Sequence, residues 1–163
     1  MTLVVDAGFV VAALVDDGPL GRWADGLLVS GPLAAPHLMP VEAANILRRA
    51  ALAGTLTGDV AGLAHADLLR LRVELLGYDV LADRVWELRG SVTAYEACYV
   101  ALAEDLDAPL ATIDVRLSRA PGPTCAFETP PATATGTGEA RAAPAPARRR
   151  RRAGHRAGRS SGS

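Results

Sequence analysis

The sequence predicts an α/β domain in which helices cover both faces of a parallel sheet. Short apolar runs such as Leu3-Val4-Val5 read as buried strands, and amphipathic helical stretches alternate with them along the chain. Strands that are buried on both faces and separated by helices are typical of a three-layer α/β/α arrangement. The chain has 163 residues, of which 50% are hydrophobic, and this supports one domain with a full core and little more.

The predicted elements alternate from the first strand onward. Strands are expected at residues 3–5, 33–35, 73–76, 110–113 and 124–127. Helices are expected at residues 7–15, 20–29, 40–53, 57–71, 80–88 and 93–106. In the helix at 40–53, Pro40 suits the first helical position and Gly54 marks the end.

Apolar faces should anchor two of these helices to the core. In the helix at 40–53 the face comprises Val41, Ala44, Leu47 and Ala51. In the helix at 57–71 it comprises Val60, Leu63, Ala64, Leu68 and Leu71.

Charge divides the chain into two parts. Residues 1–128 hold nine arginines against seventeen acidic residues, a net charge of −8, whereas residues 129–163 hold eight arginines against one glutamate, a net charge of +7. The segment 129–147 is rich in Pro, Ala, Thr and Gly and has too few large apolar side chains to fold. We therefore expect a folded domain at 1–128 and a disordered tail rich in Pro, Ala and Arg at 129–163. The arginine run at 148–152 either holds RNA phosphates or belongs to a dispensable extension.

Composition also bounds the location and the covalent chemistry. No apolar run approaches the roughly 20 residues that cross a membrane, and no basic segment opens the chain, so a cytoplasmic protein is expected. Cys98 and Cys125 are far apart in the sequence and form neither a disulfide framework nor a zinc motif. Both are expected to be small core residues.

Four acidic residues stand at the ends of predicted elements. Asp6 and Asp114 follow strands, and Glu42 and Glu96 lie in the first turn of helices. In an open parallel sheet the strand ends and the next helix starts face one crevice, so these side chains could converge there. For Glu96 a second interpretation stays open, because Thr93 three residues earlier makes a capping box with it.

Other acidic α/β domains are excluded by particular residues. A phosphoacceptor receiver domain needs a lysine, and the chain has none. A haloacid-dehalogenase-type phosphatase needs a second aspartate two residues after the first, where this chain has Gly8. No glycine-rich phosphate loop follows the first strand.

Four segments resemble, in order and spacing, the characteristic blocks of PIN-domain ribonucleases, and among these the VapC toxins of bacterial toxin–antitoxin pairs. The segments are VVDA at 4–7, PVEAANILRR at 40–49, TAYEACYVALAE at 93–104 and ATIDVRL at 111–117. The resemblance covers about residues 1–128. It implies a PIN-like three-layer α/β/α fold with a short, mostly parallel central sheet.

The resemblance also implies an activity, a cofactor and partners. It predicts a metal-dependent endoribonuclease that hydrolyses RNA phosphodiester bonds, is held inactive by a VapB-like antitoxin and forms a homodimer. The catalytic and metal-binding residues of the family correspond to Asp6, Glu42, Glu96 and Asp114. Gathered carboxylates need a cation to stay ionised, and Mg²⁺ or Mn²⁺ prefers such oxygen ligands. The substrate-binding or orienting residues would be Asn45, Arg49 and Arg116, of which the first two share a helix face with Glu42.

Two positions depart from the family pattern. Glu96 stands where the family usually has Asp, and Gly8 stands where it usually has Ser or Thr. Glutamate carries its carboxylate one methylene further out, and small misplacements of catalytic groups can lower rates by about 100-fold. The alternative function is therefore a catalytically weakened or inactive PIN-domain protein that still binds antitoxin or RNA.

Overall fold

A five-stranded sheet forms the centre of the computed structural model, which describes residues 1–135. Its strand order is β3-β2-β1-β4-β5, and every neighbouring pair is parallel. The strands are β1 (Leu3–Val5), β2 (Leu33–Pro36), β3 (Val73–Leu76), β4 (Leu110–Ala111) and β5 (Phe127–Glu128). Most of the predicted tail, residues 136–163, lies outside the described residues.

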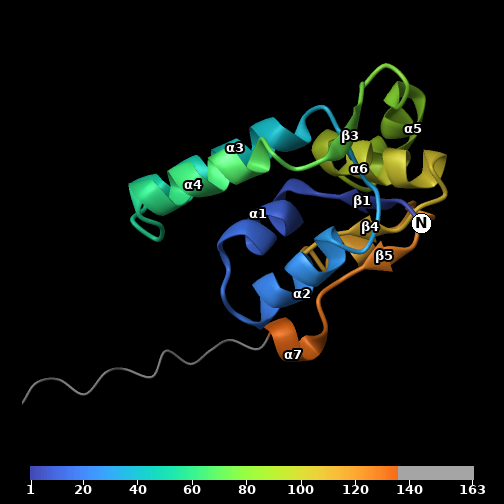
Figure 1. Ribbon diagram of the computed structural model, residues 1–163. Helices are drawn as coiled ribbons and strands as arrows, with labels where there is room; N and C mark the ends of the chain where they lie inside the picture. Colours follow the sequence, from blue (N-terminus) through green and yellow to red (C-terminus); the bar gives the residue numbers. More distant parts are fainter. Residues whose placement is uncertain (136–163) are drawn as a thin grey trace, which may run out of the picture.

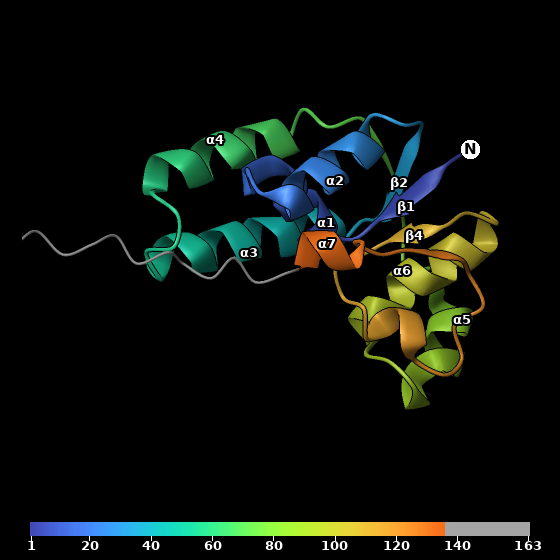
Figure 2. The same ribbon diagram turned by 90° about the horizontal axis from the view of Figure 1, so that it is seen from below.

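Helices cover both faces of this sheet (Figures 1 and 2). Four lie on one face: α1 (Ala7–Val15), α2 (Pro19–Leu28), α3 (Met39–Leu52) and α4 (Gly58–Leu68). The opposite face is covered by α5 (Ala82–Glu87), the 3-10 turn η1 (Leu88–Gly90) and α6 (Ala94–Asp105). A second 3-10 turn, η2 (Leu117–Arg119), follows β4, and α7 (Ala132–Thr135) follows β5. The predicted three-layer α/β/α fold with a short parallel sheet is confirmed.

The chain changes direction across the sheet between β1 and β4. From β1 it runs outward to β2 and β3, then crosses back over the other face to β4 and β5. Val5 pairs with Ala111, and the Asp6 amide still donates to the Ala111 carbonyl at 3.2 Å. The segments that leave these two strands therefore start side by side. Ligand sites of open α/β sheets form at this kind of reversal, outside the carboxyl ends of the strands.

Burial of α6 fixes where its amino end lies. Every residue from Ala97 to Ala103 is buried, as expected for a helix that is apolar all round. At its far end Glu104 accepts from Arg84 Nε at 2.6 Å and from the Thr124 amide at 2.7 Å, which joins α6 to α5 and to the segment before β5. The amino end of α6, with Glu96, is left at the carboxyl edge of the sheet.

The predicted core faces of α3 and α4 are confirmed at Leu47, Ala64 and Leu68, which are buried, but not at every position. Val41 and Leu63 were predicted to be buried, but they are 71% and 68% exposed, and Val60 is also exposed. The buried residues of α3 are Met39, Ala43 and Leu47. These helices pack on α1 and on each other, and the pair projects past the sheet (Figure 1). Helical spacing marks apolar positions, but it does not show which side of a projecting helix meets the core.

Several predicted boundaries shift for local reasons. The strand predicted at 110–113 ends at Ala111, because the Asp114 amide donates to Thr112 Oγ1 at 3.0 Å and turns the chain out of the sheet. Gly54 ends α3 as predicted, with φ of +73°. Secondary structure continues past residue 128, where the short helix α7 forms and contacts α2. Among the helices of residues 1–135, none combines the length and the apolar character that spanning a bilayer requires.

Candidate active site

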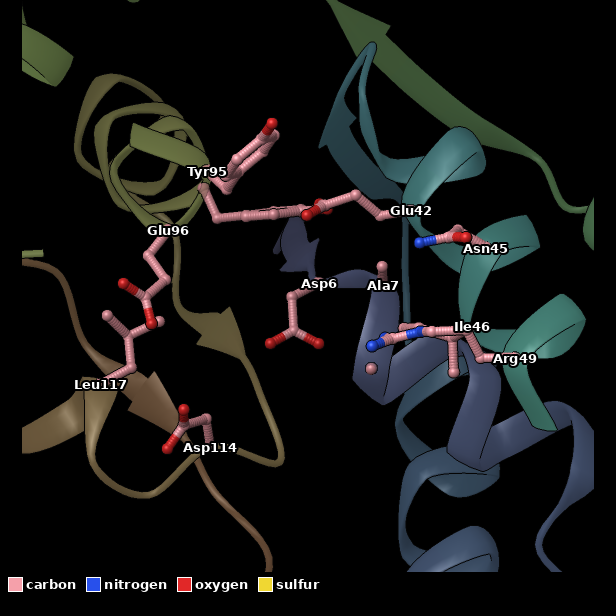
Figure 3. A pocket seen from close by; sticks show the side chains of 12 residues that line it. Asp6, Ala7, Glu42, Asn45, Ile46, Arg49, Tyr95, Glu96, Asp114 and Leu117 are labelled. Atoms are coloured by element: carbon pink, nitrogen blue, oxygen red, sulfur yellow. The ribbon is translucent and has the colours of Figure 1, made fainter. Parts of the chain in front are cut away.

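A pocket of about 230 Å³ opens at the carboxyl edge of the sheet, where β1 and β4 end. Figure 3 shows Asp6 between two walls, one formed by α3 and the other by the start of α6 and the segment after β4. The residues that line it are Asp6, Ala7, Gly8, Glu42, Asn45, Ile46, Arg49, Tyr95, Glu96, Tyr99, Asp114 and Leu117. All four acidic residues singled out in the sequence thus face one pocket, although 108 positions separate the first from the last.

Asp6 is a pocket carboxylate whose charged form is disfavoured by burial. It is the N-cap of α1, and its Oδ1 accepts from the Phe9 amide at 2.6 Å. Burial raises its pKa to about 6; the Thr112 hydroxyl and the Phe9 amide partly offset this rise, and the charges of Glu42 and Asp114 add to it. An ionised Asp6 is therefore held where negative charge is unfavourable, and a cation in the pocket would relieve that cost.

Asp114 is paired with Arg116, which the sequence placed among the substrate-binding or orienting residues. Arg116 donates from Nε to Oδ1 at 3.1 Å and from Nη2 to Oδ2 at 2.9 Å. The hydrogen bonds from Arg116 hold the pKa of Asp114 below its usual value. The Arg116 side chain is 91% exposed and does not line the pocket, so its contact with the site is made through Asp114.

Glu42 lies in the first turn of α3, and one of its oxygens is fixed from across the sheet. The Tyr99 hydroxyl of α6 donates to Glu42 Oε2 at 2.5 Å. Burial and, after it, the Glu42 carboxylate raise the pKa of Tyr99 well above its usual value, so the hydroxyl stays a neutral donor.

Glu96 forms the capping box that was the second interpretation of its sequence position. Its Oε2 accepts from the Thr93 amide and from the Thr93 hydroxyl, both at 2.8 Å, and the Glu96 amide donates back to Thr93 Oγ1. The side chain still lines the pocket. Glu96 thus caps α6 and also forms part of the acidic lining of the pocket.

Asn45 and Arg49 come from α3 on the same face as Glu42, as their spacing predicts. Both side chains point from α3 toward the centre of the pocket (Figure 3). The exposed guanidinium of Arg49 makes no ion pair within residues 1–135. It is a cation available to an anionic ligand beside the carboxylates.

The donor set fits a hard divalent cation, although it is not pre-assembled. Within residues 1–135, no three Asp, Glu, His or Cys side chains already stand in an arrangement that could hold a metal ion. Asp114 and Glu96 are turned toward Arg116 and Thr93. Oxygen ligands of four carboxylates and one amide nevertheless face a single pocket, and these are the ligands that Mg²⁺ and Mn²⁺ prefer.

Gly8 leaves space directly beside Asp6. A Cβ at this position would lie 3.5 Å from Asp6 Oδ1 and 3.3 Å from the side chain of Ile113. Ile113 is 37% exposed, so its flexible tip can yield by the few tenths of an ångström that a larger residue needs. The hydroxyl that the family usually has here would therefore fall next to Asp6.

Sequence reasoning missed two supporting residues, Tyr99 and Thr112. Thr112 is fully buried directly after β4, in a segment that is otherwise apolar, and a lone hydroxyl at such a position needs a hydrogen-bonding partner. That signal was available in the sequence. Tyr99 carried no comparable signal, because its contact with Glu42 joins positions 57 residues apart.

Comparison with known proteins identifies the class. Ribonuclease VapC1 of Mycobacterium tuberculosis is 42% identical over 126 residues, which are 77% of this chain and 95% of that protein. The crystal structure of Mycobacterium tuberculosis VapC20, a sarcin-ricin loop cleaving toxin, superposes with a TM-score of 0.56 at 18% identity over 72% of this chain and 93% of that one. The structure of VapBC2 of Rickettsia felis, bound to a promoter DNA fragment, gives a TM-score of 0.55 at 13% identity. The match covers 79% of this chain and 98% of that one. No family model matches the chain.

The fold, which the chain shares with these VapC structures, is that of a PIN-domain protein. At 42% identity over nearly the whole length of VapC1, the chain belongs to the VapC ribonuclease family. The resemblance found in the four sequence segments is confirmed.

Proposed function

We propose that this protein is a divalent-metal-dependent endoribonuclease that hydrolyses RNA phosphodiester bonds and acts as the toxin of a VapBC-type pair. Membership of the VapC ribonuclease family supports RNA as the substrate. The observation that carries the metal dependence is the single pocket that Asp6, Glu42, Glu96 and Asp114 all line. Asp6 in particular, with its pKa raised to about 6, needs a positive partner to be ionised at neutral pH without cost.

In this proposal each residue has a separate task. Asp6, Glu42 and Asp114 would hold Mg²⁺ or Mn²⁺, and Glu96 would complete the acidic lining of the pocket. The chemistry that such an ion would supply is an activated water and compensation of the charge that builds on the phosphate. Arg49 donates to phosphate oxygens, and the Asn45 amide orients the scissile group. Arg116 orients Asp114 through its two hydrogen bonds.

The test is cleavage of structured RNA by the purified chain with Mg²⁺, with Mn²⁺ and with EDTA. We expect product in the presence of either ion and none after chelation, with activity restored when the ion is added back. Cleavage that persists in EDTA would exclude the metal-dependent mechanism.

Arg49→Ala should weaken RNA binding without affecting metal binding. Loss of one phosphate contact raises KM, leaves kcat nearly unchanged and lowers the slope of log affinity against log salt by about 1. Arg48→Ala is the matched control, because Arg48 is exposed on the same helix but does not line the pocket. Equal effects of the two substitutions would mean that Arg49 contributes only general positive charge.

We also propose partners and a setting. A VapB-like antitoxin and a second copy of the chain would cover apolar side chains of α3 and α4, where Val41, Leu52 and Leu63 are 71%, 73% and 68% exposed. The VapBC2 neighbour is a toxin–antitoxin complex. The proposed RNA substrate and antitoxin partner support the cytoplasm as the compartment in which this protein acts. Light scattering of the chain alone and with a neighbouring-gene antitoxin would measure both associations.

A second candidate function is favoured by the state of two residues. Glu96 Oε2 is already hydrogen-bonded to Thr93 in the helix cap, and Gly8 has no hydroxyl to place beside Asp6. A protein with these features could bind antitoxin or RNA while cleaving slowly or not at all. Tight antitoxin binding by a chain that cleaves no RNA with either ion would favour this function.

A further inference from the structure

The hydrogen bond between Tyr99 and Glu42 joins the two walls of the pocket. Tyr99 is 4% exposed, and its hydroxyl donates to Glu42 Oε2 at 2.5 Å across 57 positions of sequence. The other two tyrosines, Tyr78 and Tyr95, are 56% and 65% exposed. The Tyr99 hydroxyl is thus held inside the protein and aimed at a pocket carboxylate.

This contact restricts Glu42 in a specific way. A glutamate side chain has three rotatable bonds, and ordering it costs conformational entropy. A hydrogen bond from a buried neutral donor to an ionised acceptor is short and strong, so it fixes the Glu42 carboxylate in one orientation. Within residues 1–135 no hydrogen bond to Glu42 Oε1 is formed, which leaves that oxygen available to a ligand.

We infer that Tyr99 is a positioning residue for the metal site: it holds Glu42 by Oε2 so that Oε1 is presented to the cation. The inference rests on the proposed function and extends it to a residue that makes no contact with the ion itself. Hydrogen-bonding partners of metal-ligating carboxylates commonly change metal affinity or activity by about 10- to 100-fold when they are removed. Tyr99 is such a hydrogen-bonding partner of the Glu42 carboxylate.

A purely structural role is the competing explanation, since the same bond ties α3 to α6. The two roles differ in what a loss of the hydroxyl changes. A structural tie lowers stability and affects the pocket only as far as the whole domain loosens. A positioning residue lowers metal affinity beyond any loss of stability.

The experiment measures Mn²⁺ affinity of the full chain by electron paramagnetic resonance, with Mn²⁺ as the only ligand. We expect Tyr99→Phe to raise the Kd for Mn²⁺ by about 10-fold or more, because phenylalanine keeps the ring and removes only the hydroxyl. Tyr78→Phe, an exposed tyrosine outside the pocket, should leave the Kd unchanged. Arg84→Gln loosens α6 at its other end by breaking the Glu104 bond, and it should lower stability without changing the Kd.

A second measurement observes the Tyr99 side chain directly and does not need the Tyr99→Phe variant. The three tyrosines are replaced by 3-fluorotyrosine, and Mg²⁺ is added while the fluorine spectrum is recorded, with Tyr78→Phe and Tyr95→Phe assigning the signals. The Tyr99 resonance should move and saturate with bound Mg²⁺, while the Tyr78 resonance stays in place. This readout holds even if Tyr99→Phe fails to fold.

The outcomes separate this inference from the proposed function. The positioning role alone is overturned if wild type and Tyr99→Phe bind Mn²⁺ with equal affinity. It is also overturned if the Tyr99 resonance does not shift when Mg²⁺ is added. A Kd raised as much by Arg84→Gln as by Tyr99→Phe also overturns it, in favour of a structural tie. If the wild type binds neither ion, the metal-dependent function falls, and the positioning role falls with it.

Discussion

Asp6→Asn is expected to lower the rate of RNA cleavage strongly and, in the same protein, to increase stability. The loss of activity follows from the central place of Asp6 among the pocket carboxylates. A metal ion supplies several kcal/mol of transition-state stabilisation, and each 1.36 kcal/mol is a factor of about ten in rate. Loss of the ion through loss of this ligand should therefore lower cleavage by about 1,000-fold.

The gain in stability follows from the pKa of Asp6, which burial raises from 3.8 to about 6. A carboxyl with a raised folded-state pKa binds its proton more tightly in the folded chain, so stability falls as pH rises between about 4 and 6. Above pH 6 the ionised group costs up to about 3 kcal/mol, because a tenfold change in proton affinity corresponds to about 1.4 kcal/mol. Asparagine has no charge to desolvate and caps a helix as well as aspartate does, so the variant avoids that cost.

Urea unfolding of the metal-free proteins at two pH values checks this prediction. At pH 7.5 Asp6→Asn should be more stable than the wild type, and near pH 4, where Asp6 is largely protonated, the two should be nearly equal. Circular dichroism confirms that the inactive variant is folded. A variant that is less stable at pH 7.5, or a difference that stays the same at both pH values, would contradict the electrostatic account of Asp6.

Glu96→Asp is expected to raise the rate of RNA cleavage by up to about 100-fold, since that is the scale on which misplaced catalytic groups limit enzymes. In the wild type, Glu96 Oε2 accepts from the Thr93 amide and hydroxyl. Aspartate is one methylene shorter and cannot reach back to the Thr93 amide from the same position, so its carboxylate is released to face the pocket. Loss of that bond should cost about 1 kcal/mol of stability.

Glu96→Gln is the matched control for this substitution. Glutamine can still accept from the Thr93 amide and preserves the capping box, but it removes the charge. It should leave stability close to that of the wild type and should lower both cleavage and Mn²⁺ affinity. A folded Glu96→Asp protein that cleaves no faster than the wild type would show that the natural glutamate does not limit the activity. Activity that appears only in Glu96→Asp would establish the wild type as a catalytically silent relative.

The sequence predicted the arrangement of strands and helices because the signals are local. The apolar run before Asp6, the Thr93–Glu96 capping box and the positive-φ Gly54 each act within a few residues. Alternation of helices with short apolar strands then favours a parallel sheet, and its reversal between β1 and β4 brings the strand-end acids together. The burial of Val41 and Leu63 was predicted wrongly, because α3 and α4 project past the sheet and leave one apolar side without a partner in the described chain.

The sequence by itself determined the fold class and the four acidic residues that reach one pocket, because each of them stands at the end of an element whose direction local patterning sets. Only the tertiary structure decided the partner of Glu42 and the surroundings of Asp6. Glu42 pairs with Tyr99 from another helix, and Asp6 lies where burial raises its pKa to about 6. These are effects of packing between distant segments, and spacing along the chain carries no information about the solvent or the donors that a folded side chain meets.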